Sequence, residues 1–112
     1  MSSVLNSSSR IYRLDKFVVP KTAREEFLAR VRQTHALLRN QPGFVRDILL
    51  EKPATGGNFT VVTLVEWQDA DSVQRAREAI ADMHREAGFT PRELLDRLGI
   101  EADIGNYTSI HG

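Results

Sequence analysis

Phe59–Trp67 (FTVVTLVEW) decides the fold, because its run of β-branched and aromatic residues predicts the clearest β-strand in the chain. Residues 53–58 (PATGGN), just before it, carry a strong turn signal. Residues 44–52 (FVRDILLEK) predict a second strand on the other side of that turn. The short connection between the two strands predicts a β-hairpin, around which the other elements can be placed.

An amphipathic helix is predicted on the N-terminal side of this hairpin. Thr22 and Glu25 have the spacing of a capping box, in which each residue caps a backbone N–H of the first turn. A stripe at three- and four-residue spacing follows, and Gln41-Pro42-Gly43 ends the helix. The stripe consists of Ala23, Phe27, Val31, Thr34 and Leu38.

Two more helices are predicted on the C-terminal side of the hairpin. Asp69 or Asp71 is placed to cap the first of them, and Gly88 supplies a left-handed stop. A short helix then starts at Thr90-Pro91 and ends at Gly99. The apolar stripe of the longer helix consists of Val73, Ala76, Ile80, Met83 and Ala87, and that of the short one of Leu94, Leu95 and Leu98.

Two outer strands complete the fold, one over Ile11–Val19 (IYRLDKFVV) and one over residues 102–110 (ADIGNYTSI). The order β-α-β-β-α-(α)-β predicts an α+β, ferredoxin-like split βαβ fold. Its four-stranded antiparallel sheet would carry the helices on one face. We expect a single domain over residues 11–112, preceded by a serine-rich disordered tail over residues 1–10.

The composition narrows the classes of function. The 112 residues carry 15 Lys and Arg against 15 Asp and Glu, so the chain lacks the basic balance of a nucleic-acid-binding protein. The absence of cysteine excludes disulfides, thiolate catalysis and cysteine metal ligands. Without a phosphate-binding loop, a nucleophile elbow or a spaced metal motif, we expect neither a metal nor an organic cofactor. No apolar run is long enough for a membrane span or a signal peptide, so we expect a soluble, cytoplasmic protein.

The alternation of side chains along the strands predicts a dimer. Within Phe59–Trp67, Val61 and Val65 share one face while Val62 and Leu64 share the other. Helices cover only one face in this topology, so the second apolar face predicts a homodimer packed sheet to sheet. A monomer with a solvated sheet face is the alternative. The second strand is divided in the same way, with Phe44, Ile48 and Leu50 on one face and Val45 and Leu49 on the other.

Three features carry a resemblance to a known family. They are the strand–helix opening, the motif Gln41-Pro42-Gly43-Phe44 that leads into the second strand, and the motif Val65-Glu66-Trp67-Gln68 that closes the third. Across residues 11–110 the chain resembles the antibiotic biosynthesis monooxygenase (ABM) family. The resemblance implies a dimeric ferredoxin-like α/β barrel. It also implies one of the family's activities, which are cofactor-independent oxygenation of anthrone-type or quinol substrates and, in a subset, haem degradation.

The family's functional residues are matched in part. Trp67 matches the tryptophan of the polyketide-oxidising members, but their asparagine four residues earlier is Thr63 here. Their tyrosine at the start of the next helix is Val73. Of the haem-degrading pattern only His84 is matched, because Gln74 stands where that pattern has tryptophan and the first strand has no asparagine.

Trp67, His84 and Thr63 are the main candidates for a functional role. Trp67 either packs in the core or forms the aromatic wall of a pocket for a planar molecule. His84 borders an apolar stripe, and is either a structural histidine or a general base. Thr63 is the candidate hydrogen-bond donor in place of the asparagine. His35, on the first helix, has the same two alternatives as His84.

Further polar residues fall within the predicted strands. Four of them are charged and form either a solvated network that fixes the dimer register or an acid–base site inside the barrel. These four are Arg13, Asp15, Asp47 and Glu66. A second group lies in the first and last strands and consists of Tyr12, Asn106 and Tyr107. These residues are predicted to contact the substrate; the alternative for the two tyrosines is a packing role with a hydrated hydroxyl.

Together these features predict a cofactor-independent monooxygenase that acts on a small phenolic, quinol or anthrone-type molecule. Such chemistry needs no metal where the substrate anion itself passes an electron to oxygen, provided that a dry pocket orients it. Trp67 would be the wall of that pocket, His84 the base and Thr63 the donor. The alternatives are a non-catalytic dimeric module of the same fold that binds a small molecule, and a haem-binding or haem-degrading relative.

Overall fold

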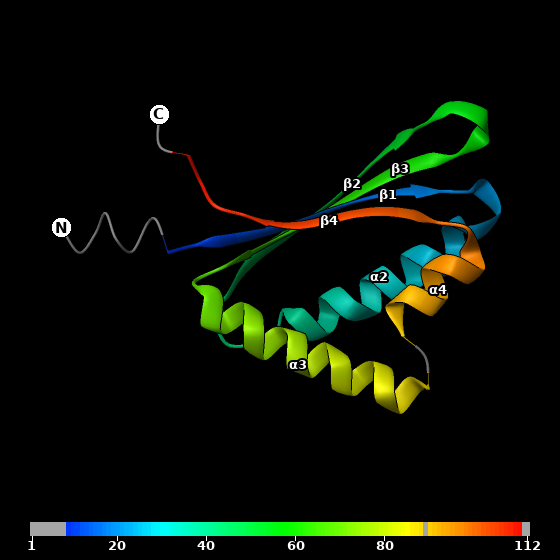
Figure 1. The fold of residues 1–112 in the computed structure, drawn as a ribbon. Helices are drawn as coiled ribbons and strands as arrows, with labels where there is room; N and C mark the ends of the chain where they lie inside the picture. Colours follow the sequence, from blue (N-terminus) through cyan, green and yellow to red (C-terminus); the bar gives the residue numbers. More distant parts are fainter. Residues whose placement is uncertain (1–8, 89, 111–112) are drawn as a thin grey trace.

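The computed structural model describes residues 9–88 and 90–110, which form an α+β domain of two layers (Figure 1). A four-stranded sheet is one layer, and the helices are the other, on one face of the sheet. The strands are β1 (Ile11–Val19), β2 (Phe44–Pro53), β3 (Phe59–Trp67) and β4 (Glu101–Tyr107). The helices are α2 (Arg24–Leu38), α3 (Ala70–Ala87) and α4 (Pro91–Leu98), with 3₁₀ turns η1 (Lys21–Ala23) and η2 (Thr55–Gly57). The predicted ferredoxin-like split βαβ fold is confirmed.

The sheet has the strand order β2-β3-β1-β4, and all its neighbouring strands are antiparallel. In this register Ile11 lies opposite Trp67, and Phe17 lies opposite Val61. Phe17, Val61 and Trp67 are buried, so the odd-numbered residues of β1 and β3 face the helices. The alternation predicted for β3 is therefore confirmed.

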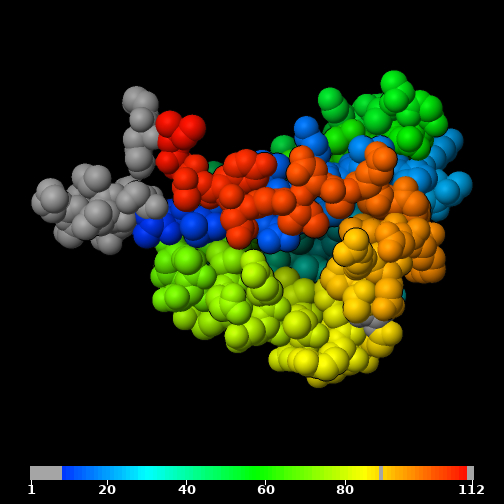
Figure 2. Space-filling model, in the orientation of Figure 1, coloured from blue at the N-terminus to red at the C-terminus, as the bar shows by residue number. Residues whose placement is uncertain are grey.

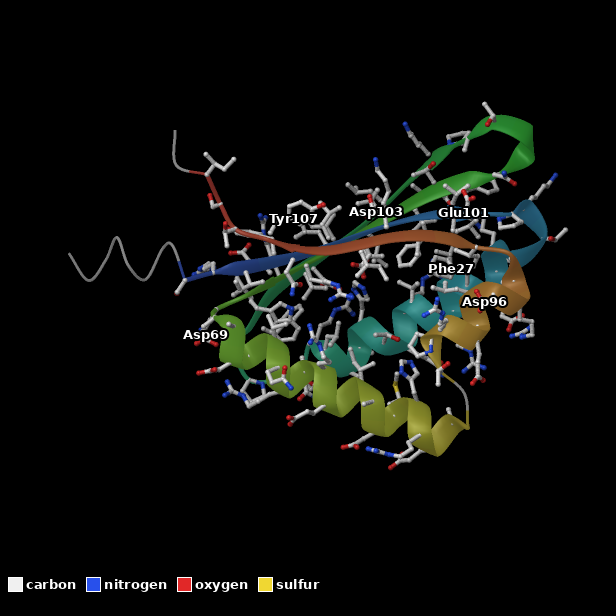
Figure 3. All side chains as sticks on the ribbon, in the orientation of Figure 1. Phe27, Asp69, Asp96, Glu101, Asp103 and Tyr107 are labelled. Carbon is white, nitrogen blue, oxygen red and sulfur yellow. The ribbon has the colours of Figure 1, made fainter. Side chains whose placement is uncertain are left out.

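The other face of the sheet, called the open face, is covered by none of the helices of the described residues (Figure 1). Its apolar residues include Leu50, which is 59% exposed. Tyr107 also lies on this face, pairs with Tyr12 and is 51% exposed. Figure 3 shows Tyr107 and Asp103 above the sheet and Phe27 below it, between sheet and helices. The apolar side chains of the open face are those of Leu14, Val18, Ile48, Leu50, Val62 and Leu64.

A β-bulge changes the faces that the sequence predicted for β2. The register shifts between Phe44 and Arg46, so Phe44 lies opposite the buried Trp67 on the helix side. After the shift, Ile48 lies opposite Leu64 on the open face. The prediction that Phe44 and Ile48 share a face is wrong, because the extra residue of a bulge reverses the alternation beyond it.

The start of α2 also differs from the prediction. Thr22 lies in η1, and α2 starts at Arg24 with Ala23 as its N-cap and no side-chain cap. The capping box of Thr22 and Glu25 is therefore wrong. The N–H of Ala23 donates to the Pro20 carbonyl at 2.9 Å, and this tight turn places Thr22 too early in the chain to cap the helix.

The predicted ends of α3 and α4 are confirmed. The Asp69 carboxylate accepts a hydrogen bond from the Ser72 N–H at 2.8 Å at the start of α3. Thr90 Oγ1 accepts one from the Glu93 N–H at 3.2 Å at the start of α4. Gly88 and Gly99 follow the two helices with positive φ, which favours glycine.

The core between sheet and helices is divided into two clusters of buried residues. The first is centred on Phe17 and Phe27, whose rings meet edge to face with centroids 4.9 Å apart. Leu95 and Leu98 of α4 pack against it. The second is centred on Trp67, whose ring meets that of Phe44 at 5.8 Å. Along β3 the first cluster ends at Val61 and the second begins at Val65, so Thr63 lies between them.

The chain ends lie partly outside the described residues. Residues 1–8, most of the predicted tail, and residues 111–112 are among those not described. Arg10, which the sequence placed in the tail, donates from Nη1 to the Glu66 carboxylate at 2.5 Å. The domain boundary at residue 11 stays a prediction. Over the described ranges, no helix has the length and apolar character that crossing a membrane requires.

Candidate functional site

A belt of polar residues separates the two core clusters, on the helix side of the sheet. It is positioned by the register: Asp15 of β1 lies opposite Thr63 of β3, and Asp47 of β2 lies opposite Val65. Thr63 is buried, as is His35, which reaches the belt from α2. We call this group the polar belt, and it consists of Arg13, Asp15, His35, Asp47 and Thr63.

Two adjoining hollows lie against the polar belt. The larger has a volume of about 440 Å³ and is lined by residues of the sheet, α2, α3 and α4. The smaller, of about 290 Å³, extends toward Trp67. Arg13, Asp15, His35 and Thr63 line both hollows, so the belt lies where the two meet. In the surface view of Figure 2, part of α2 is visible between β4 and α3.

His35 is held by a carboxylate. Its Nδ1 donates to Asp47 Oδ2 at 2.8 Å, and Asp47 also accepts from Arg39 Nη2 at 2.9 Å. Burial by itself raises the pKa of Asp47, but the hydrogen bonds from Arg39 and His35 outweigh it, so this pKa lies below its usual value. Asp47 is thus a stable anion that fixes the orientation of the imidazole ring.

Asp15 has the opposite electrostatic character. It accepts a hydrogen bond from Arg13 Nε at 2.8 Å. Burial raises the pKa of Asp15, and the attraction of Arg13 and His35 offsets only part of that effect. The cavity therefore contains one carboxyl group that binds a proton more readily than usual, and such groups are common at functional sites.

His84 lines the larger hollow from α3, together with Met83 and Ile80. Burial lowers its pKa, and the nearby Arg30 guanidinium lowers it further. The neutral imidazole is thereby favoured, and this is the form that accepts a proton. No cluster of three or more His, Asp or Glu side chains suited to a metal ion occurs among residues 9–88 and 90–110.

The structure brings three of the candidate site residues to the two hollows. Thr63 lines both, and His84 lines the larger. Trp67 lines the smaller hollow and is only 3% exposed, so it packs in the second core cluster and also forms a wall. Core packing and lining of the hollow, which the sequence offered as alternatives for Trp67, are therefore compatible.

The other three candidates are not brought to the hollows. Tyr12 and Tyr107 lie opposite each other on the open face, across the sheet from the polar belt. Asn106 lies opposite Arg13, on the helix side of β4, but it is exposed and lines neither hollow. Their predicted contact with a substrate stays a prediction.

The polar belt contains charged residues whose role the sequence did not decide. Arg13, Asp15 and Asp47 were expected in one network with Glu66, yet Glu66 lies on the open face with Arg10 and Arg46. The sequence feature that pointed to these residues was the presence of charged side chains within strands that are otherwise apolar. What the sequence could not indicate was the bulge, which turns Asp47 toward the helices.

The sequence pattern of the family described as "antibiotic biosynthesis monooxygenase" matches residues 11–89. The chain belongs to the ABM family. Among curated protein sequences no match was found.

Solved structures similar to this ABM protein share its fold over nearly the whole chain. A proposed monooxygenase from Shewanella loihica has 17% identity and a TM-score of 0.69, covering 94% of this chain and 98% of that one. SnoaB, a cofactor-independent oxygenase from Streptomyces nogalater, has 26% identity and a TM-score of 0.60, covering 93% and 96%. A dimeric ferredoxin-like protein from an uncultured marine organism has 14% identity and a TM-score of 0.65, covering 93% and 98%.

Proposed function

We propose that this ABM protein is a cofactor-independent oxygenase of small phenolic, quinol or anthrone-type molecules. The observation that carries the proposal is the polar belt, which places proton-transfer groups against a cavity of about 440 Å³. That volume falls in the range of small-molecule sites, about 300–1,000 Å³. The likeness to SnoaB supports the same reaction class.

The reaction is written most simply for anthrone, whose central CH₂ becomes a carbonyl while O₂ is reduced to water. A base first takes one proton of that CH₂, and the resulting anion passes an electron to O₂. The two radicals combine with a new C–O bond, and the peroxide anion takes up a proton. The protein must supply a base, a donor for the substrate oxyanion and a site that excludes water.

Three residues are proposed for these roles. His84 is the base for the first proton, and its lowered pKa supports this because the ring is neutral at neutral pH. The Thr63 hydroxyl is the donor to the substrate oxygen, since it lines both hollows. Trp67 is the aromatic wall at the end of the smaller hollow. A planar substrate would pack against its ring by offset stacking.

We also propose that the protein is a homodimer in which the open faces of two sheets pack together. The apolar side chains of the open face support this arrangement, because Leu50 is exposed and the others are only partly buried. The dimeric ferredoxin-like relative supports it as well. In such a dimer Tyr12 and Tyr107 would contact the partner subunit.

Oxygen consumption with anthrone, and with a substituted hydroquinone, tests the activity. We expect uptake above buffer with the wild type. Thr63→Val, which keeps the shape of the side chain, should slow turnover by roughly 10²-fold, as loss of one oxyanion donor does. Trp67→Ala should raise KM, and His84→Gln should slow the first proton transfer. Glu78→Gln, on the exposed side of α3, is the control and should match the wild type.

The outcome separates the proposal from its main alternative. Uptake no faster than in buffer for every substrate would contradict the oxygenase. If the same molecules quench Trp67 fluorescence without turnover, the protein is the non-catalytic binding module instead.

A further inference from the structure

The His35–Asp47 pair has the geometry of a positioned base. Its Nδ1···Oδ2 distance is 2.8 Å, and the two side chains are 6% and 13% exposed. A carboxylate that accepts from Nδ1–H leaves Nε2 as the nitrogen that accepts a proton, and stabilises the imidazolium that forms. The hydrogen bond that joins α2 to β2 thus also orients an imidazole that can act as a base.

The free nitrogen of His35 borders the cavity. Nε2 has no hydrogen-bond partner in the described part of the chain, and no fully buried polar side-chain atom there lacks one. Nε2 is therefore in contact with the hollow space that His35 lines. The charged and titratable groups that line this space with His35 are Arg13 and Asp15 from β1, Arg30 from α2, and Arg77 and His84 from α3. Asp47 of β2 contacts His35 directly and is itself bonded to Arg39 of α2.

Oxidation of a CH₂ group to a carbonyl requires the loss of two protons from the same carbon. The first loss precedes the reaction with O₂, and His84 is proposed for it above. The second occurs at the hydroperoxide stage, where the carbon carries one remaining hydrogen and an O–OH group. Because the hydroperoxide is neutral, a base must be in place for this second step as well.

We propose that His35, oriented by Asp47, is the catalytic base for this second proton; the inference rests on the oxygenase activity proposed above. His35 Nε2 removes the remaining C–H proton, the electron pair forms the C=O bond, and the O–O bond breaks. The departing hydroxide takes the proton from His35 Nε2 and leaves as water. One hydroperoxide thus yields one ketone and one water, and His35 returns to its neutral form.

The test compares oxygen uptake with ketone formation, using anthrone as the probe. His35→Gln and Asp47→Asn are the test variants, and circular dichroism confirms that each is folded. Hydroperoxide is trapped with a phosphine, which reduces it to the corresponding alcohol. Arg32→Gln is the control, because Arg32 is an exposed residue on the same helix as His35.

We expect the test variants to take up oxygen yet form ketone more slowly, by about 10²-fold, the usual contribution of one acid–base residue. Trapped alcohol should rise in both test variants and stay at the wild-type level in Arg32→Gln. In ¹H–¹⁵N NMR spectra, His35 should carry its proton on Nδ1 in the wild type and lose that preference in Asp47→Asn.

Two results would overturn this inference in different ways. Wild-type ratios of ketone to oxygen in both test variants would refute the role of His35 while leaving the oxygenase intact. A wild-type protein that consumes no oxygen with anthrone or quinol would refute the proposed function, and the role of His35 with it.

Discussion

Asp15 and Thr63 lie directly opposite each other in the register of β1 and β3, on the face that the helices cover. The apolar pair of Phe17 and Val61 flanks them on one side. On the other side Arg13 and Val65 come next, and the apolar pair of Ile11 and Trp67 follows. Polar residues at these positions interrupt an otherwise continuous core. The interruption leaves the polar belt and the hollow space beside it, which a fully apolar sheet face would have filled.

Two similar substitutions in the polar belt should have opposite effects on stability. Asp15→Asn should raise the free energy of unfolding at neutral pH by about 1 kcal/mol, because burial disfavours the charge there. Asp47→Asn should lower it by about 1–3 kcal/mol, because the hydrogen bonds from Arg39 and His35 favour that charge. Urea denaturation of both variants measures the difference.

The pH dependence of each effect has a definite sign. Asp15 binds its proton more readily when folded, so its contribution to stability falls as pH rises from the ordinary carboxyl pKa to the raised one. Asp47 has the lowered pKa, so its contribution is lost as pH falls from the ordinary value to the lowered one. Equal effects of both variants at every pH would contradict this account.

The rate of the proposed reaction should depend on the ionisation of His84. Because burial and Arg30 lower the pKa of His84, the rise of kcat/KM with pH should have its midpoint below the ordinary imidazole value. Arg30→Gln removes the second of these causes, so the midpoint should move to higher pH. Arg32→Gln, an exposed arginine on the same helix, serves as control, and an equal shift in both variants would contradict the assignment.

Gly43 of the Gln41-Pro42-Gly43-Phe44 motif should be intolerant of a side chain. Its φ is +86°, and a Cβ there would lie 1.9 Å from Ser72 Oγ at the start of α3. Gly57 has a similar φ of +80° but has nothing within 4 Å of that position. Gly43→Ala should therefore cost about 1–3 kcal/mol more than Gly57→Ala, the added cost of overpacking. Thermal denaturation of the two variants makes the comparison.

A charge at the centre of the open face should dissociate the proposed dimer. Leu64 of β3 lies between Leu14 of β1 and Ile48 of β2 on that face. Leu64→Arg should reduce the mass measured by light scattering from twice 12.6 kDa to 12.6 kDa. Ala81→Arg, an exposed position of α3, adds the same charge elsewhere and should leave the dimer intact. A wild-type mass of one chain would refute the dimer directly.

Much of the fold followed from local pattern. The strand Phe59–Trp67, the caps at Asp69 and Thr90 and the stops at Gly88 and Gly99 depend on neighbours a few residues away, so periodicity and capping chemistry suffice to find them. The wrong predictions also concerned local structure, but there the backbone geometry of a turn or a bulge decided the outcome. The turn after Pro20 displaced the predicted cap at Thr22, and one extra residue near Phe44 reversed the faces of β2.

The sequence by itself determined the elements, their order and the apolar character of both sheet faces, because each of these is encoded in the spacing of residues along the chain. Only the tertiary structure decided which polar residues meet. His35 and Asp47 lie on α2 and β2, and their contact depends on the bulge in β2 and on how α2 packs across the sheet. Hydrogen bonds between elements are set by packing, and packing has no periodic signal in the sequence.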